Sequence, residues 1–295
     1  MTRMMSTTSR TLPLCLFFLI GVAARPVVGQ TPEQTPDKPA ANASPVAAAQ
    51  ASDDDAALDL AEPDYTVVNI PTTLRLPLHK GDFHLTHRFN GNLRQGSFGD
   101  QASDLFGLDR GATIGFEFRY GIVPHLQAAA TRSSFDKTIQ FSGKYDAIHQ
   151  HAGTPVSVSG LVSVEGPNNF QERFAPALGA VVSRTIQQHL AVYVSPIWVH
   201  NSAAALGVDR ETFMVGIGGR VRLGSSTYVV GEFTPRPGGY EPGSTEYAFG
   251  IEKRVGAHVF QLTFANTQGT TYGQLARGGS PETLYLGFNL TRKFY

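Results

Sequence analysis

The last stretch of the chain, Glu282-Thr-Leu-Tyr-Leu-Gly-Phe-Asn-Leu-Thr-Arg-Lys-Phe-Tyr295, decides the fold. From Leu284 to Leu290 every second residue is apolar, and the residues between them are mostly small or polar. This is the period of a β-strand with one apolar face. A final strand that runs into an aromatic end is typical of outer-membrane β-barrels, in which the barrel-assembly machinery reads that strand. Phe294 is in phase with the apolar face, whereas Tyr295 is one step out of phase.

Residues 1–29 have the pattern of a secretory signal peptide. Arg3 and Arg10 precede an apolar run that ends at Ala24 and is too short to span a bilayer comfortably, and the small residues Ala24 and Gly29 are candidate cleavage sites. The only cysteine, Cys15, lies inside this segment, so the mature chain is expected to hold no disulfide and no thiolate metal site. No later apolar run suits a transmembrane helix, which leaves a soluble protein or a β-barrel.

Residues 30–63 are rich in Pro, Ala, Gln and Asp and show no apolar period, so we predict a disordered periplasmic linker there. Residues 64–295 are predicted to form one barrel domain. The whole chain has 24 Lys and Arg against 24 Asp and Glu, so no charge excess points to nucleic acid. Charged residues make up 16% of the chain, below the roughly 25% of soluble domains. A low charge suits a barrel whose outside meets lipid.

From Lys80 onward the sequence alternates with a period of two and predicts an all-β fold, a single antiparallel transmembrane β-barrel of about twelve strands. In the second strand, for example, Phe116 and Phe118 point outward while Glu117 and Arg119 point inward. The predicted strands are residues 82–90, 111–122, 125–132, 137–148, 155–165, 174–185, 190–200, 211–223, 226–235, 245–254, 257–267 and 282–295.

The connections between these strands alternate in length. Short turns are predicted at Val123-Pro124, 187–189, Gly224-Ser225 and Gly256-Ala257, and long loops at 91–110, 167–173, 201–210, 238–244 and 269–281. Short periplasmic turns opposite longer extracellular loops are the pattern of outer-membrane barrels. Outward aromatic residues are expected to gather near the long-loop end as an interfacial girdle: Phe89, Phe174, Trp198, Phe213, Phe233, Tyr247 and Phe264.

Several segments resemble the DUF5777 family of outer-membrane β-barrel proteins. They are Leu105-Phe-Gly-Leu-Asp109, Ser134-Phe-Asp-Lys-Thr138, His258-Val-Phe-Gln-Leu262, Leu286-Gly-Phe-Asn-Leu290, and Lys80-Gly-Asp-Phe83 with His87-Arg-Phe89. The likeness covers about 66–295. It implies an integral barrel of the bacterial outer membrane and supplies no catalytic residues.

The leading hypothesis for function is a narrow pore or facilitator for small solutes. The alternative is a non-conducting structural or docking barrel for periplasmic or surface partners. Small inward residues would leave the lumen open, whereas opposed charges would equally well close it. The candidate pore-lining residues are Arg88, Glu117, Arg119, Lys144, Arg220, Arg222, Glu232 and Glu252. Arg119, Arg220 and Arg222 are expected to approach the periplasmic mouth and to favour anions.

Catalytic and metal chemistry find little support in the sequence. No local signature of a Ser/His/Asn lipase is present, and the loop acids Asp109, Asp136 and Asp209 are isolated, so we expect no enzyme and no cofactor. Five histidines fall at predicted periplasmic turns: His125, His149, His151, His189 and His258. Histidines in such positions could bind a transition metal or sense pH, but histidine is also a common polar residue at a membrane interface, so we predict no metal site. The expected partners are outer-membrane lipid, the assembly machinery and a small solute.

Overall fold

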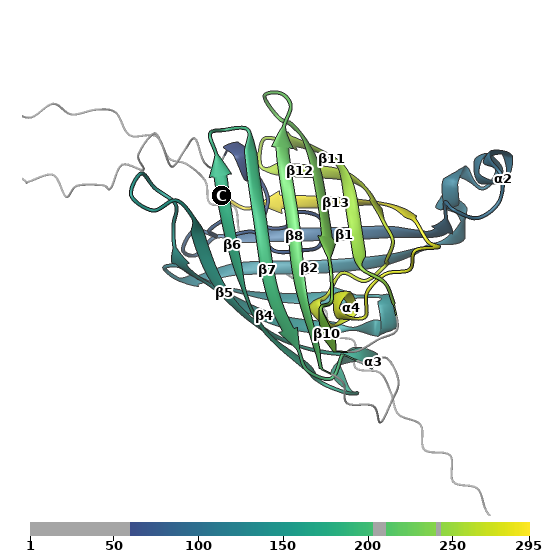
Figure 1. Ribbon diagram of the computed structural model, residues 1–295, viewed down its shortest axis with the longest axis horizontal. Coiled ribbons are helices and arrows are strands. Elements are labelled where there is room, and N and C mark those ends of the chain that lie inside the picture. Colours follow the sequence, from purple (N-terminus) through teal and green to yellow (C-terminus); the bar gives the residue numbers. More distant parts are fainter. Residues whose placement is uncertain (1–59, 203–210, 240–242) are drawn as a thin grey trace, which may run out of the picture. The chain divides into compact units, whose positions relative to one another are not determined.

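The computed structural model describes residues 60–202, 211–239 and 243–295. The predicted signal peptide and most of the predicted linker lie outside these residues. Twelve antiparallel strands form a closed barrel, because β8 pairs with β9 and β1 pairs with β13 (Figure 1). The strands are β1 Gly81–Asn92, β2 Ala112–Val123, β3 Leu126–Ser133, β4 Ile139–Ile148, β5 Ser157–Gly166, β6 Ala175–Ile186, β7 Leu190–Val199, β8 Thr212–Arg222, β9 Thr227–Thr234, β11 Glu246–Val255, β12 His258–Ala265 and β13 Tyr285–Lys293. All twelve predicted strands are present.

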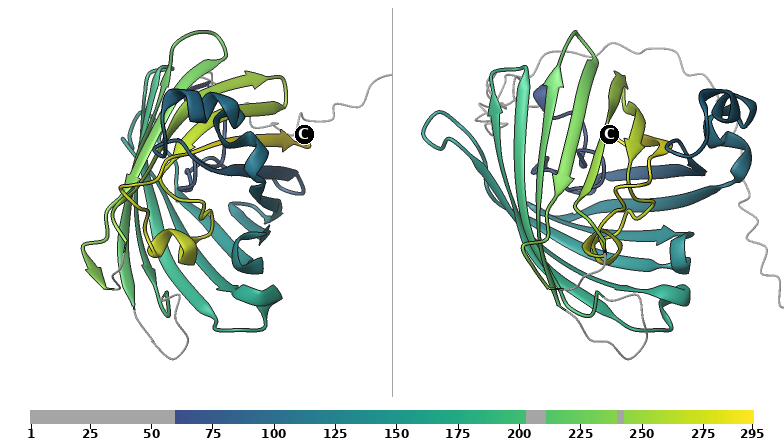
Figure 2. Two further views of the ribbon diagram at one scale, coloured as in Figure 1. Left: turned by 90° about the vertical axis from the view of Figure 1, so that its right-hand side faces the viewer. Right: turned by 45° about the vertical axis from the view of Figure 1, so that its right-hand side comes forward.

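Several short helices and one short strand lie at the long-loop end of the barrel. They are α2 Phe98–Ser103, η1 Leu105–Arg110, η2 Phe135–Lys137, α3 Pro167–Phe170, α4 Tyr272–Ala276 and a two-residue strand, β10 Gly238–Gly239, which pairs with β8. Figures 1 and 2 show α2 projecting beyond the strand ends, whereas α4 lies close to the wall. Among the described residues, no helix is long and apolar enough to cross a membrane.

The two faces of the wall differ as the alternation predicts. Large apolar side chains are exposed on the outer face of most strands, among them Phe116, Phe141, Leu178, Val194, Phe249 and Leu262. A continuous apolar surface of this kind marks contact with lipid. The register also pairs aromatics of the predicted girdle, since Trp198 lies opposite Phe213 and Tyr247 opposite Phe233, at the strand ends that carry the long loops.

The alternation of connection lengths holds with one exception. The connection 134–138 at the long-loop end is shorter than 149–156 at the opposite end. Since β1 starts and β13 ends beside each other, with Asp82 opposite Lys293, both ends of the barrel lie at the short-turn side.

The register of β13 can be tested with one residue. Phe288 lies on the outer face, where its ring stacks on that of His87 with 4.8 Å between centroids. We expect Phe288→Asp to lower the yield of membrane-inserted protein, because a charge in hydrocarbon costs up to about 2–4 kcal/mol, and less for Asp than for Arg or Lys. Phe288→Leu is the control that keeps the apolar contact. Equal inserted yields of the two variants, measured by heat-modifiable migration on gels, would contradict this placement of the outer face.

Candidate functional site

The lumen is occupied by the chain itself. Residues 60–78, called here the inner segment, precede β1 and run through the inside of the barrel (Figures 1 and 2). They enter at the short-turn end, where the hydroxyl of Tyr228 donates to the carbonyl of Leu60 at 2.8 Å. They leave at the same end, where the amide of His79 donates to the carbonyl of Gly121. Ala61 and Glu62, predicted as disordered linker, are buried here.

At its innermost point the inner segment forms a tight hairpin. Thr66 pairs with Pro71, the amide of Val67 donates to the carbonyl of Ile70, and that of Thr72 donates to Tyr65. The turn between them presents three backbone N–H groups in one direction. All three donate to the carboxylate of Glu232, from Val68 at 2.9 Å, Asn69 at 2.8 Å and Ile70 at 3.2 Å. Glu232 therefore satisfies donors that a buried turn would otherwise leave unpaired.

The carbonyl groups of the inner segment are also satisfied by the wall. Arg220 donates to Thr66, Gln261 to Val67, Asn289 to Val68, and Lys144 to both Thr72 and Leu74, over distances of 2.6–3.0 Å. Arg88 donates to the side chain of Asn69 at 3.0 Å. Strands β1, β4, β8, β9, β12 and β13 thus all contribute a polar side chain to this one segment.

Glycines of β8 make room for the tip of the hairpin. A Cβ atom built on Gly216 or Gly218 would stand 2.8 Å from the side chain of Ile70, which is closer than side chains approach each other. Ile70 and Val67 pack with Tyr193, Ala191 and Val230 of the wall in one apolar cluster. The small inward residues of β8 therefore accommodate one particular side chain.

Tyr295, at the end of the sequence, also forms a hydrogen bond with the inner segment. The hydroxyl groups of Tyr65 and Tyr295 lie 2.6 Å apart in a hydrogen bond, although Tyr295 itself is half exposed. The amide of Phe294 keeps the strand pairing by donating to the carbonyl of Gly81. Tyr295 is out of phase with the outer face, as predicted, and its hydroxyl reaches inward to the inner segment.

The eight predicted lining residues all lie on the inner face, in three groups. Arg88, Lys144, Arg220 and Glu232 bind the inner segment directly, and Glu252 binds Arg220 at 2.9 Å with both side chains fully buried. Arg119 forms ion pairs with Asp82 at 2.6 Å and with Glu117. Arg222 stands apart at the short-turn end, where it donates to the carbonyl of Ser225. The opposed charges that the sequence left open are thus largely paired.

The long-loop end is narrowed by a second segment, the β12–β13 loop (residues 266–284). Its α4 folds inward, and the amide of Gly273 donates to the carboxylate of Glu165 at 2.9 Å. The Gln274 side chain donates to Phe135 and Thr138, both at 3.0 Å. Leu275 and Ala276 pack in an apolar cluster with inward residues of β5 to β8.

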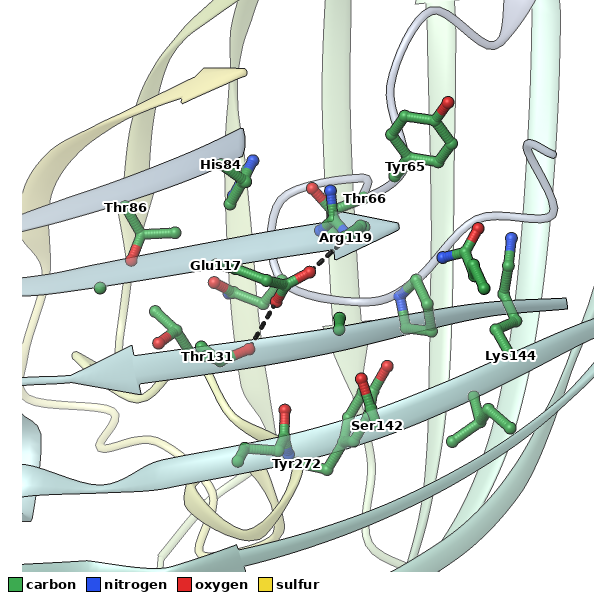
Figure 3. A pocket seen from close by; sticks show the side chains of 18 of the residues that line it. Tyr65, Thr66, His84, Thr86, Glu117, Arg119, Thr131, Ser142, Lys144 and Tyr272 are labelled. Carbon is green, nitrogen blue, oxygen red and sulfur yellow. Dashed lines mark hydrogen bonds and ion pairs between the residues drawn. The ribbon is translucent and has the colours of Figure 1, made fainter. Parts of the chain in front are cut away.

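Between the inner segment, the β12–β13 loop and the wall of β1 to β5 there remains a small chamber of about 50 Å³. Figure 3 shows Glu117 and Arg119 on β2, Thr131 on β3 and Ser142 on β4 facing it, with Tyr65 and Tyr272 at its borders. Since one water needs about 10–15 Å³ of such volume, the chamber holds a few waters and no larger solute.

The sequence profile of DUF5777, described as a membrane bound beta barrel domain, matches residues 64–294. The chain belongs to this family. With its apolar outer face and antiparallel barrel, this DUF5777 chain is an integral barrel of the outer membrane, and its outer face contacts lipid. A comparison with curated protein sequences finds no match.

Three solved structures are similar to this DUF5777 barrel. The NanC porin has a TM-score of 0.47 and 9% identity, over 72% of this chain and 98% of that one. The KdgM porin in complex with disordered oligogalacturonate has a TM-score of 0.48 and 5% identity, over 72% of this chain and 99% of that one. The COG4313 outer membrane channel from Pseudomonas putida F1 has a TM-score of 0.48 and 12% identity, over 75% of this chain and 97% of that one.

No cluster of metal-ligand side chains is found among the described residues of this DUF5777 barrel. Two of the turn histidines have local partners. His151 bonds to Thr154 at 3.0 Å, and His258 lies 2.9 Å from a guanidinium nitrogen of Arg292. Sequence reasoning missed the inner segment as part of the site, although the run Tyr65-Thr-Val-Val-Asn-Ile70 has the composition of a strand and contrasts with the linker before it.

Proposed function

We propose that this protein is an outer-membrane pore for small solutes that is closed by its own inner segment. The observation that carries the proposal is the chemistry of the contacts between that segment and the wall. The wall binds the backbone of the segment through Lys144, Arg220, Glu232, Gln261 and Asn289, which are groups that water also solvates well. A wall of this kind remains stable when water replaces the segment, whereas an apolar core would not.

In the closed state the chamber admits a few waters, so solutes pass only after the inner segment leaves. The eight lining residues then border the water-filled path: Arg88, Glu117, Arg119, Lys144, Arg220, Arg222, Glu232 and Glu252. The assembly machinery reads β13 and the exposed ring of Phe294, and the barrel carries no catalytic activity. A twelve-stranded barrel lies between small barrels filled by side chains and large open porins, so its contents decide whether it conducts.

The test replaces residues 60–78 with a Gly/Ser segment of equal length. We expect this variant to conduct ions in a planar bilayer, whereas the natural chain is closed most of the time. A Gly/Ser segment lacks the Val67 and Ile70 side chains that pack against the wall, and it has no hairpin that holds its backbone groups toward the wall. Heat-modifiable migration and outer-membrane fractionation serve as controls for assembly. If the assembled variant does not conduct, the pore proposal fails and the alternative, a non-conducting docking barrel, takes its place. The pairing of the inner charges, such as Arg220 with Glu252, is the observation that favours that alternative.

A further inference from the structure

A second cavity, of about 380 Å³, lies at the short-turn mouth of the barrel. It is called here the vestibule. It is bordered by the inner segment on one side and by the ends of the β-strands on the other, and its lining includes Glu62, Arg75, Arg254, Lys293 and Tyr295. Pro77 and Tyr295 at its rim are exposed, so the cavity opens to the periplasmic side. Its volume falls in the range of small-molecule sites.

Two arginines of the vestibule have no carboxylate partner among the described residues. Arg75 of the inner segment and Arg254 of β11 are half-buried and line the cavity, and neither forms an ion pair within residues 60–202, 211–239 and 243–295. Arg119 and Arg220 of the lumen differ, since each is paired with an acid. An unpaired, half-buried guanidinium has donors free for an anion, and its planar fork fits a carboxylate.

The remaining charges of the vestibule are engaged with neighbours. The amine of Lys293 lies over the rings of Tyr65 and Tyr295, at 5.2 and 5.9 Å from their centroids. Glu62 accepts from the amide of Thr73 at 3.0 Å. Burial raises the pKa of the Glu62 carboxyl, so it opposes an incoming anion less than a solvated carboxylate would.

We propose that the vestibule is a binding site for carboxylate anions, held by Arg75 and Arg254. This chemistry has two candidate sources. One is a free organic acid in the periplasm, which would make anions the solute class of the proposed pore, and that extension rests on the proposed function. The other is the acidic run Asp53-Asp-Asp55 of the same chain, which lies outside the described residues and precedes Leu60 in the sequence.

Binding of citrate to the full mature chain in detergent micelles, measured by calorimetry, tests the site without any need for conduction. We expect Arg75→Ala/Arg254→Ala to weaken binding at least about tenfold, because both charge-assisted contacts are lost. The matched control is Arg184→Ala/Lys253→Ala, two exposed cations at the same end that point outward and should leave the affinity unchanged. Arg75→Ala alone keeps the barrel wall intact and should give a smaller loss.

The triple variant Asp53→Asn/Asp54→Asn/Asp55→Asn separates the two sources. Unchanged affinity for citrate means that the free anion is the ligand. A gain of about tenfold or more means that the acidic run occupies the vestibule, since a tethered ligand acts at an effective concentration in the millimolar range. Equal citrate affinity of the natural chain and Arg75→Ala/Arg254→Ala, or no binding to either the natural chain or the triple variant, would overturn the proposal. A failure of conduction would leave this result untouched.

Discussion

Glu232→Ala is expected to raise the open probability of the pore at least about a hundredfold. In the closed state the Glu232 carboxylate accepts three backbone N–H groups of the hairpin turn, at 2.8–3.2 Å. A hydrogen bond to a charged group contributes about 1.5–3 kcal/mol, and the loss of Glu232 also leaves buried donors unpaired. Even if the three bonds are far from additive, a loss of roughly 3–6 kcal/mol exceeds the roughly 2.8 kcal/mol that a hundredfold shift requires.

Single-channel recording in planar bilayers measures this shift directly. Glu232→Gln keeps the size and one acceptor oxygen, so we expect it to fall between the natural chain and Glu232→Ala. The matched control is Glu117→Gln, because Glu117 is also an inward carboxylate but binds Arg119 and Thr131 instead of the inner segment. If Glu117→Gln opened the pore as strongly as Glu232→Ala, the effect would come from the charge of the lumen and the hairpin would not be the gate.

A disulfide between the hairpin and β8 is expected to close the opened pore again. The Cβ of Ile70 lies 3.4 Å from the position of a Cβ built on Gly216, and disulfides need about 3.5–4.5 Å between these atoms. The sequence has one cysteine, Cys15, so an introduced pair has no competing thiol if the predicted signal peptide of residues 1–29 is removed. We expect Ile70→Cys/Gly216→Cys in the Glu232→Ala background to conduct when reduced and to lose at least about 99% of its conductance when oxidised.

The control for the disulfide is Ile70→Cys in the same background, which should conduct equally under both redox conditions. Formation of the bond is checked by mass spectrometry of the unreduced protein. Full conductance of the oxidised, cross-linked barrel would show that solutes pass beside a seated hairpin, and the inner segment would then line the path without closing it.

The strands of the barrel wall were predictable from the sequence because the alternation of apolar and polar residues depends only on neighbouring residues. A period of two with apolar residues outward fixes the face of each residue, and Phe288 outward and Asn289 inward follow from that rule alone. The same rule places Arg220 and Glu252 inside. Whether they pair depends on the register between β8, β9 and β11, which a single sequence does not show.

The inner segment was not predictable because each of its partners is distant in the chain. Val68 is bonded to Glu232 and Asn289, which are 164 and 221 residues away. From the sequence, Gly216 and Gly218 are simply small residues on the inner face. Nothing near them in the sequence indicates that Ile70 fills the space that their missing side chains leave. The composition of residues 65–70 differs from that of the linker, but Pro71 argues against a wall strand, so the segment had no place in a pattern of alternating strands.

The inner segment is connected to both β1 and β13, the two strands that must pair for the barrel to close. It is covalently joined to β1, and it bonds to Asn289, Thr291 and Tyr295 at the far end of the chain. Bringing the first and last strands together costs the entropy of closing a loop that contains nearly the whole barrel, and this cost is the same whether or not the lumen is filled. Because the segment is tethered to the first strand, its hydrogen bonds to the last strand offset part of that entropy cost. The residues that fill the lumen are therefore expected also to promote the pairing of β1 with β13 that closes the barrel.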